Sequence, residues 1–250
     1  MLGLRKFVRF PFVLPVVLAG VFPGTGTAAE PDYSEYARLL DRYVEPIGVR
    51  YEQWHRNETD RAALRTVLDG FADVDPATLS KEEATAFYVN LYNAAMIEAV
   101  LREYPIDSVR EIGFLPFAVF RREFIRLGDA KLSLDEIEKE ILLEKYFDPR
   151  IHFAVNCASE SCPALRGEPF RGAELDRQFE EQTVLFANSA KAARVREGEG
   201  ATAYSELFQW YADDFPGDDP AVYLNRYRDD PLPTGNEIRW IDYDWSLNQL

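Results

Sequence analysis

The hydrophobic positions of residues 30–250 predict a chain built mainly from amphipathic helices. Apolar side chains recur at helical spacing in five segments, and two of these begin with a Ser-x-x-Glu capping box, at Ser80 and at Ser133. The segment after Ser80 is the longest and ends before Pro105. Helices are expected at about 33–43, 62–71, 81–103, 134–147 and 175–189.

Strand patterns are short and few. Residues 124–132 place Gly-Asp between two apolar runs and predict a hairpin, and the alternation of 238–243 predicts a further strand. The apolar run 151–155 predicts a buried strand, whereas the polar, glycine-containing stretch 191–202 is expected to be a loop. The aromatic stripe of 205–215 predicts a short helix that faces the core. The sum is a helix-rich α+β single domain with a small, mostly antiparallel sheet.

Residues 1–29 have the pattern of a cleavable secretory signal peptide. Three basic residues near the start precede an apolar stretch that ends at Phe22, and small residues lead up to Glu30. We expect cleavage before Glu30, which leaves one globular domain of residues 30–250. The protein is therefore expected in the periplasm or outside the cell, with no stable membrane insertion after cleavage.

The strongly acidic composition narrows the expected partners. The net charge is −15, and removal of the three basic residues before Glu30 takes it to −18. Such a charge opposes binding to nucleic acid or to an anionic membrane. The expected ligand is a small molecule, a peptide or an envelope protein. The sequence contains no glycine-rich phosphate loop and too few histidines and cysteines for a zinc site, so neither a cofactor nor a metal is expected.

The stretch Arg150–Pro163 is the candidate site, because it holds both cysteines and one of the two histidines of the chain. A thiol, an imidazole and a buried amide are the groups of papain-like and transglutaminase-like enzymes, in which a thiolate attacks an acyl carbon. The candidate catalytic residues are Cys157, His152 and Asn93. The candidate binding residues are Asn90, Asn156, Ser159 and Arg150.

This chemistry has structural requirements. In a regular strand His152 and Cys157 would point to opposite faces, because they are five residues apart, so a turn after Val155 is needed. The positive groups of Arg150, His152 and Arg166 are expected to lower the pKa of the thiol. Backbone amides of the loop 156–159 are expected to face a developing oxyanion.

Two structural alternatives compete with these roles. Cys157 and Cys162 are close enough in sequence to form a disulfide in an oxidising compartment. Asn90 and Asn93 lie on the apolar face of a predicted helix, where an amide must be hydrogen-bonded. Either they cap a neighbouring loop from within the core, or one of them orients a catalytic group.

Several segments together resemble one family, the bacterial and plant proteins grouped as domain of unknown function 547. The family pattern places a histidine after Ile137-Glu138, where this chain has Lys139, and plant relatives tend to have serine in place of Cys162. The resemblance implies family membership and brings no agreed activity with it. The segments that carry it are 86–94, 133–138, 150–159, 161–163, 208–211 with 214–215, and 243–248.

Two functional hypotheses follow. We favour an exported, soluble envelope protein with a non-catalytic or binding domain, in which Cys157 and Cys162 form a small disulfide loop. The alternative is a cysteine-dependent hydrolase or acyl-transfer enzyme that acts on peptide or amide bonds.

Overall fold

The computed structural model describes residues 30–250, and the predicted signal peptide lies outside these residues. The helix-rich α+β class is confirmed, since helices alternate with three small sheets. Within residues 30–250, no helix is both long enough and apolar enough to cross a bilayer.

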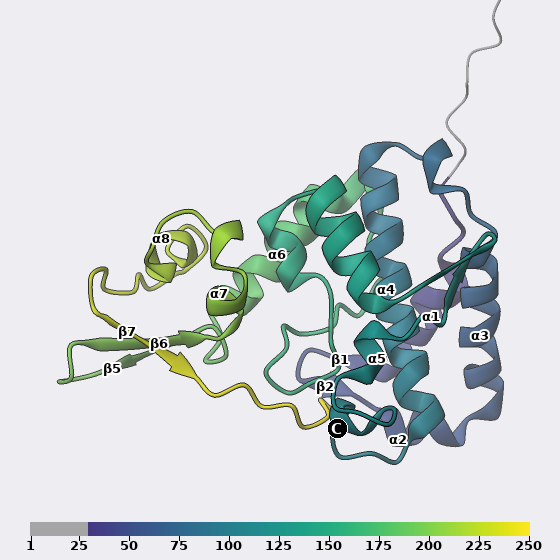
Figure 1. Cartoon of the computed structure of the whole chain (residues 1–250), viewed down its shortest axis with the longest axis horizontal. Helices are drawn as coiled ribbons and strands as arrows, with labels where there is room; N and C mark the ends of the chain where they lie inside the picture. Colours follow the sequence, from purple (N-terminus) through teal and green to yellow (C-terminus); the bar gives the residue numbers. More distant parts are fainter. Residues whose placement is uncertain (1–29) are drawn as a thin grey trace, which may run out of the picture.

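The first half of the chain packs its helices around one central helix, α4 (Lys81–Glu103) (Figure 1). The neighbours of α4 include α2 (Tyr51–Arg56) and α3 (Glu58–Ala72), and α1 (Ser34–Tyr43) packs on both. The predicted capping box is present, with the Ser80 Oγ accepting from Glu83 N at 3.2 Å and Glu83 Oε2 accepting from Ser80 N at 2.8 Å. Every residue of α4 from Ala84 to Leu101 is buried, so the helix is enclosed on all sides rather than on one face.

Shorter helices connect the remaining parts. They are η1 (Pro76–Thr78), η2 (Val109–Glu111), α5 (Ala118–Arg121), the π-helical η3 (Glu136–Leu143), η4 (Pro149–Phe153), η5 (Gly172–Glu174), α6 (Leu175–Ala187), α7 (Leu207–Trp210), η6 (Ala212–Asp214) and α8 (Pro220–Leu224).

The strands of residues 30–250 form three separate sheets. The pairs β1 (Val44–Glu45) with β2 (Gly48–Val49), and β3 (Ile125–Leu127) with β4 (Ala130–Leu132), are antiparallel, and the second pair is the predicted hairpin. The third sheet has the order β5 (Ala193–Arg196), β6 (Ala201–Ser205), β7 (Glu237–Ile241). In it β5 and β6 are antiparallel, whereas β7 runs parallel to β6.

Two predictions of local structure were wrong. Residues 151–155 are not a strand, because Asp148 caps the turn by accepting from Arg150 N at 2.9 Å and Pro149 follows it at the first helical position. These start signals give the short helix η4, which packs against α6 and buries the apolar run. Residues 191–202 are not a loop but most of the β5–β6 hairpin, whose turn contains two glycines in the left-handed conformation.

In the described part of the chain, two hydrophobic clusters make up the core. The larger surrounds α4, and the smaller gathers aromatic rings from η4, α7 and α8, among them Phe153, Phe208 and Tyr223. The segment after β7 then returns from the third sheet to the helices, as the yellow trace in Figure 1 shows. Its residues bridge to earlier parts of the chain, with Leu247 beside Ser159 and Gln249 beside Val49.

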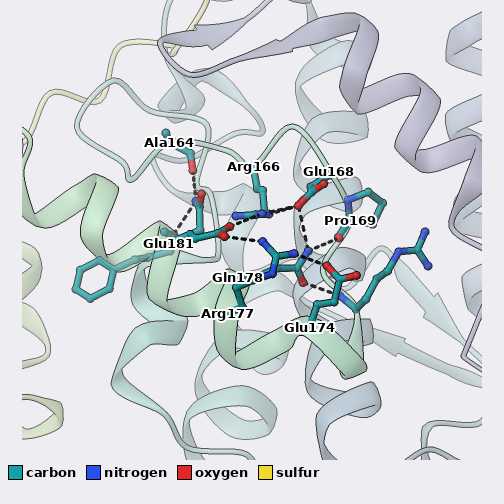
Figure 2. A network of polar contacts seen from close by, with 11 residues as sticks. Ala164, Arg166, Glu168, Pro169, Glu174, Arg177, Gln178 and Glu181 are labelled. Carbon is teal, nitrogen blue, oxygen red and sulfur yellow. Dashed lines mark hydrogen bonds and ion pairs between the residues drawn. The ribbon is translucent and has the colours of Figure 1, made fainter. Parts of the chain in front are cut away.

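The loop after Pro163 is tied to α6 (Figure 2). Gln182 donates to Ala164 O at 2.8 Å, and Gln178 donates to Pro169 O at 3.0 Å. Arg166 forms ion pairs with Glu168 and Glu181. These contacts fix the chain that leaves the candidate site.

Candidate functional site

A turn formed by Asn156–Ser159 presents the Cys157 side chain. The Asn156 Oδ1 accepts from Ala158 N at 2.9 Å, and Asn156 Nδ2 donates to Pro163 O at 2.8 Å. Ala158 has a positive φ of 59°, which is uncommon for a residue with a Cβ atom and must be held by its surroundings. Asn156 therefore shapes the turn with both ends of its side-chain amide.

The Cys157 thiol is surrounded by hydrogen-bond donors. Its Sγ lies 3.0 Å from Ser159 Oγ and 3.4 Å from the hydroxyl of Tyr243. Burial alone would raise the pKa of this thiol, but hydrogen bonds from Cys162, Ser159 and Tyr243 favour the thiolate and lower the pKa to about 7. Burial raises the pKa of Tyr243 well above its usual value, so its hydroxyl stays protonated and can donate.

Cys162 lies beside Cys157, but its pKa is shifted in the opposite direction. Its Sγ accepts from Cys157 N at 2.9 Å, and burial raises its pKa. Both cysteines are free thiols in the structure.

His152 is the second group of the site. Its Nε2 lies 2.7 Å from Asp214 Oδ2, and its ring packs on Tyr211 with 4.2 Å between centroids. Burial lowers the pKa of His152, although the neighbouring Asp214 and Glu138 carboxylates oppose that shift. The imidazole is thus neutral at pH 7, with the proton on Nε2 donated to Asp214.

Glu138 is a buried carboxylate between two tyrosines. Its Oε1 accepts from Tyr211 at 2.6 Å and its Oε2 accepts from Tyr92 at 3.2 Å. Burial raises the pKa of both tyrosines, which keeps their hydroxyls protonated. Glu138 stands in the π-helical turn η3, a local widening of a helix that is frequent at functional sites.

These groups line one open cavity of about 470 Å³ between the two hydrophobic clusters. Its polar residues are Asp135, Glu138, Lys139, His152 and Cys157, with Arg121. Its aromatic residues are Tyr92, Phe117, Phe120, Trp210, Tyr211, Tyr243 and Trp245. A cavity with aromatic walls and a few convergent polar groups is typical of a small-molecule or peptide-binding site. Within residues 30–250, no group of three or more His, Cys, Asp or Glu side chains is placed to hold a metal ion.

Residues 76–187 match the family model described as "Protein of unknown function, DUF547". This segment belongs to the DUF547 family. It contains Asn93, Glu138, His152 and Cys157, whereas Asp214 and Tyr243 come from the chain beyond the match. No curated protein and no solved structure matches the chain.

The structure brings some of the predicted site residues together. His152 and Cys157 of the DUF547 segment line the same cavity, although no hydrogen bond joins them, and Ser159 contacts the thiol. The turn after Val155 that such a site requires is present, because η4 replaces the expected strand.

The two asparagines of α4 act on the backbone. Asn93 Oδ1 accepts from Asn156 N at 2.8 Å, and Asn93 Nδ2 donates to Ala154 O at 3.0 Å. Asn90 makes the same pair of bonds with the backbone of Phe170. The prediction that both amides are buried and hydrogen-bonded is confirmed. Neither forms a hydrogen bond with His152, and both hold the backbone of a neighbouring loop.

One expectation about the surroundings of the thiol was wrong. Arg150 and Arg166 do not line the cavity, because Arg150 pairs with Asp148 and Asp176 and Arg166 pairs with acidic residues beside α6 (Figure 2). Two backbone amides of the turn are occupied within it, since Cys157 N donates to Cys162 and Ala158 N donates to Asn156, whereas the backbone of Ser159 is hydrogen-bonded to the Cys157 sulfur. Hydrogen bonds from Cys162, Ser159 and Tyr243 take the place of the expected cationic groups.

Sequence reasoning missed Glu138, Asp214 and Tyr243. Glu138 falls among Leu134, Ile137 and Leu142 on a face that is otherwise apolar, and this pattern was a usable signal.

The aromatic stripe of 205–215 was assigned to the core as a whole. Phe208 and Phe215 do belong to the core, but Trp210 is 45 % exposed and lines the cavity.

Proposed function

We propose that the protein is a cysteine-dependent hydrolase or acyl-transfer enzyme that acts on an amide or peptide bond, with Cys157 as the nucleophile. The observation that carries this proposal is the Cys157 thiol, which lines the cavity and has a pKa of about 7. About half of such a thiol is ionised at neutral pH, and the thiolate is the attacking form. Cys162, whose pKa is raised by burial, has the character of a structural cysteine.

The reaction needs one proton carrier. The Cys157 sulfur attacks the acyl carbon, the carbon–nitrogen bond breaks, and the proton lost by the thiol passes through the imidazole of His152 to the leaving nitrogen. Water, or an amine in acyl transfer, then attacks the thioester and gives up a proton through the same imidazole. The acid or amide product leaves and the thiol is restored.

The pair of His152 and Asp214 suits this role. Because Nε2 is held by Asp214 at 2.7 Å, Nδ1 of the neutral ring is the nitrogen left to accept a proton. His152 and Cys157 are not hydrogen-bonded in the absence of substrate, and catalytic hydrogen bonds often shorten only in the substrate complex. Tyr243, a protonated donor within 3.4 Å of the sulfur, is the candidate donor to the oxyanion.

The proposal includes export. The basic, apolar and small-residue pattern of residues 1–29 supports a cleavable signal peptide and a place in the periplasm or outside the cell. N-terminal sequencing of the exported protein should begin at or near Glu30. A mature protein that starts at Met1 would contradict this part of the proposal.

A non-catalytic binding domain is the second candidate. The observation that favours it is the contact between Cys157 N and Cys162 Sγ at 2.9 Å, which places two cysteines side by side in a chain with a secretory pattern. Oxidation would join them in a short loop and remove the nucleophile. The cavity would then bind a ligand without converting it.

Alkylation and turnover together separate the two candidates. The purified protein is treated with iodoacetamide without reductant between pH 5 and 9, and mass spectrometry locates the label. The enzyme predicts rapid labelling of Cys157 with a midpoint near pH 7 and hydrolysis of a panel of amide and thioester substrates. Hydrolysis should be lost in Cys157→Ala and in His152→Gln, whereas Cys162→Ala, which removes one hydrogen bond that favours the thiolate, should keep some hydrolysis with its pH midpoint shifted upward. Labelling that requires a reductant, in material kept as it was exported, would support the disulfide-containing binding domain instead.

A further inference from the structure

Glu138 is a charged group that its own chain leaves without a cation. The carboxylate is held by the hydroxyls of Tyr92 and Tyr211, and within residues 30–250 no lysine, arginine or histidine forms an ion pair with it. The adjacent Lys139 pairs with Asp135 at 2.7 Å. Only 9 % of the Glu138 surface is exposed, yet the residue lines the cavity.

The burial of this carboxylate is unfavourable unless a ligand compensates it. A buried carboxylate is expensive without a cationic partner, and neutral hydroxyl donors offset only part of that cost. The nearby imidazole offers no charge, because burial lowers the pKa of His152. The cavity therefore contains a buried carboxylate that has hydroxyl donors but no cationic partner.

The positive residues of the cavity do not neutralise the Glu138 carboxylate. Arg121 and Lys139 are both exposed, and Lys139 is already paired, so water screens their charge much more than that of Glu138. The net charge of −15 also raises the local concentration of cations around the protein.

The walls next to Glu138 suit a cation as well. The hydroxyls of Tyr92 and Tyr211 donate to its two oxygen atoms, and the rings of both tyrosines line the cavity. Trp210 and Tyr243 line the same cavity, with 4.8 Å between their ring centroids. Aromatic faces attract ammonium and guanidinium groups, most strongly where water is excluded.

We propose that Glu138 and the aromatic rings beside it bind a primary ammonium or guanidinium group of the substrate, next to Cys157. The assignment rests on the proposed function, because it makes this cation a part of the molecule whose acyl group meets the thiol. The substrate class is then an amide or peptide with a basic side chain or a free amino group near the bond that is cleaved.

The test compares probes that differ only in charge. Binding is followed through tryptophan fluorescence, since Trp210 and Trp245 line the cavity. The probes are N-acetyl-arginine amide against N-acetyl-citrulline amide, and butylammonium against butanol. Each cationic probe should bind at least about tenfold more tightly than its neutral counterpart, the factor expected for one charge-assisted hydrogen bond.

A matched pair of variants assigns the effect to one carboxylate. Glu138→Gln should lose the preference for the cationic probes, whereas Glu140→Gln, an exposed change in the same helix, should retain it. Equal binding of the charged and neutral probes by the unaltered protein, or a preference that survives Glu138→Gln, would overturn the proposal. The comparison of charged and neutral probes uses the unaltered protein, so it tests the proposal even if Glu138→Gln fails to fold.

The two proposals can fail separately. Cys157→Ala should still prefer the cationic probes, so that preference can be measured in a protein without a nucleophile. A reactive Cys157 without any preference for cations would remove the substrate assignment alone. A preference for cations in a protein with an unreactive Cys157 would remove the enzyme and leave a binding site for cations.

Discussion

Asn93 holds the turn that carries the nucleophile by binding the backbone of Asn156. Its side chain accepts from Asn156 N at 2.8 Å and donates to Ala154 O at 3.0 Å, so both halves of the amide act on the chain just before Cys157. A single side chain of the most deeply buried helix therefore sets the position of the thiol.

Replacement of Asn93 by alanine should destabilise the protein by about 1–3 kcal/mol, because the N–H of Asn156 and the carbonyl of Ala154 lose their buried partner. Urea denaturation measures this change. Gln53→Ala, which removes an exposed amide on α2, is the matched control and should have no comparable effect. An unfolding free energy of Asn93→Ala equal to that of the control would contradict the role assigned to the amide.

Replacement of Tyr243 by phenylalanine should raise the pKa of Cys157 above about 7, because the thiolate loses one hydroxyl donor. Loss of one hydrogen bond to a charged group corresponds to about one pH unit. The midpoint of the pH dependence of iodoacetamide labelling reports it. Tyr227→Phe removes a hydroxyl elsewhere in the protein, and its labelling midpoint should equal that of the unaltered protein.

Acid should weaken the fold through His152. Its pKa in the folded protein is lowered by burial, so below about pH 6.5 the unfolded chain takes up the proton first and the free energy of unfolding falls as the pH falls. Asp214 opposes this lowering, and Asp214→Asn should depress the pKa further and make the loss below pH 6.5 steeper.

The chain has only two histidines, so NMR titration of the imidazole protons resolves His152 from His55. Urea denaturation at pH 7.5 and pH 5.5 measures the accompanying fall in the free energy of unfolding. Asp213→Asn, a change at an exposed neighbouring residue, is the control for Asp214→Asn. A His152 that titrates at or above pH 6.5 would rule out this explanation of acid sensitivity.

Replacement of Gly172 by alanine should destabilise the protein by about 1–3 kcal/mol, because its Cβ would lie 2.8 Å from the backbone of Glu83 at the start of α4. Gly70 offers the contrast, since a Cβ there meets nothing within 4 Å and the residue lies inside α3. Gly70→Ala should be neutral or stabilise by up to about 1 kcal/mol. The midpoint of thermal unfolding should therefore fall in Gly172→Ala and stay level or rise in Gly70→Ala. Equal midpoints in the two variants would show that Gly172 is not a close contact.

Local patterns accounted for most of the helices but not for the chemistry of the site. The capping boxes at Ser80 and Ser133 formed as predicted, because their partners are three residues away. The buried amide of Asn93 was predictable too, since an amide on an apolar face requires a partner. Asp214 and Tyr243 were not, because they reach His152 and Cys157 across 62 and 86 residues, and only tertiary packing selects such partners.

The failure at residues 151–155 shows the limit of hydropathy. An apolar run of five fits a buried strand and a buried turn of helix equally well. Asp148 and Pro149 form the N-terminal cap of η4, and this local signal favours the helix over a strand.

The segment after β7 makes the reactivity of the thiol depend on the far end of the chain. Ser246 O and Asp244 O accept from the amides of Glu160 and Ser161, and Tyr243 completes the hydrogen bonds to Cys157. A folding chain whose final residues have not yet docked holds Cys157 without Tyr243, and its thiol is then less acidic. In a pulsed alkylation experiment during refolding, the labelling rate of Cys157 would rise when the segment after β7 docks. The thiol therefore reports on the docking of the last part of the chain.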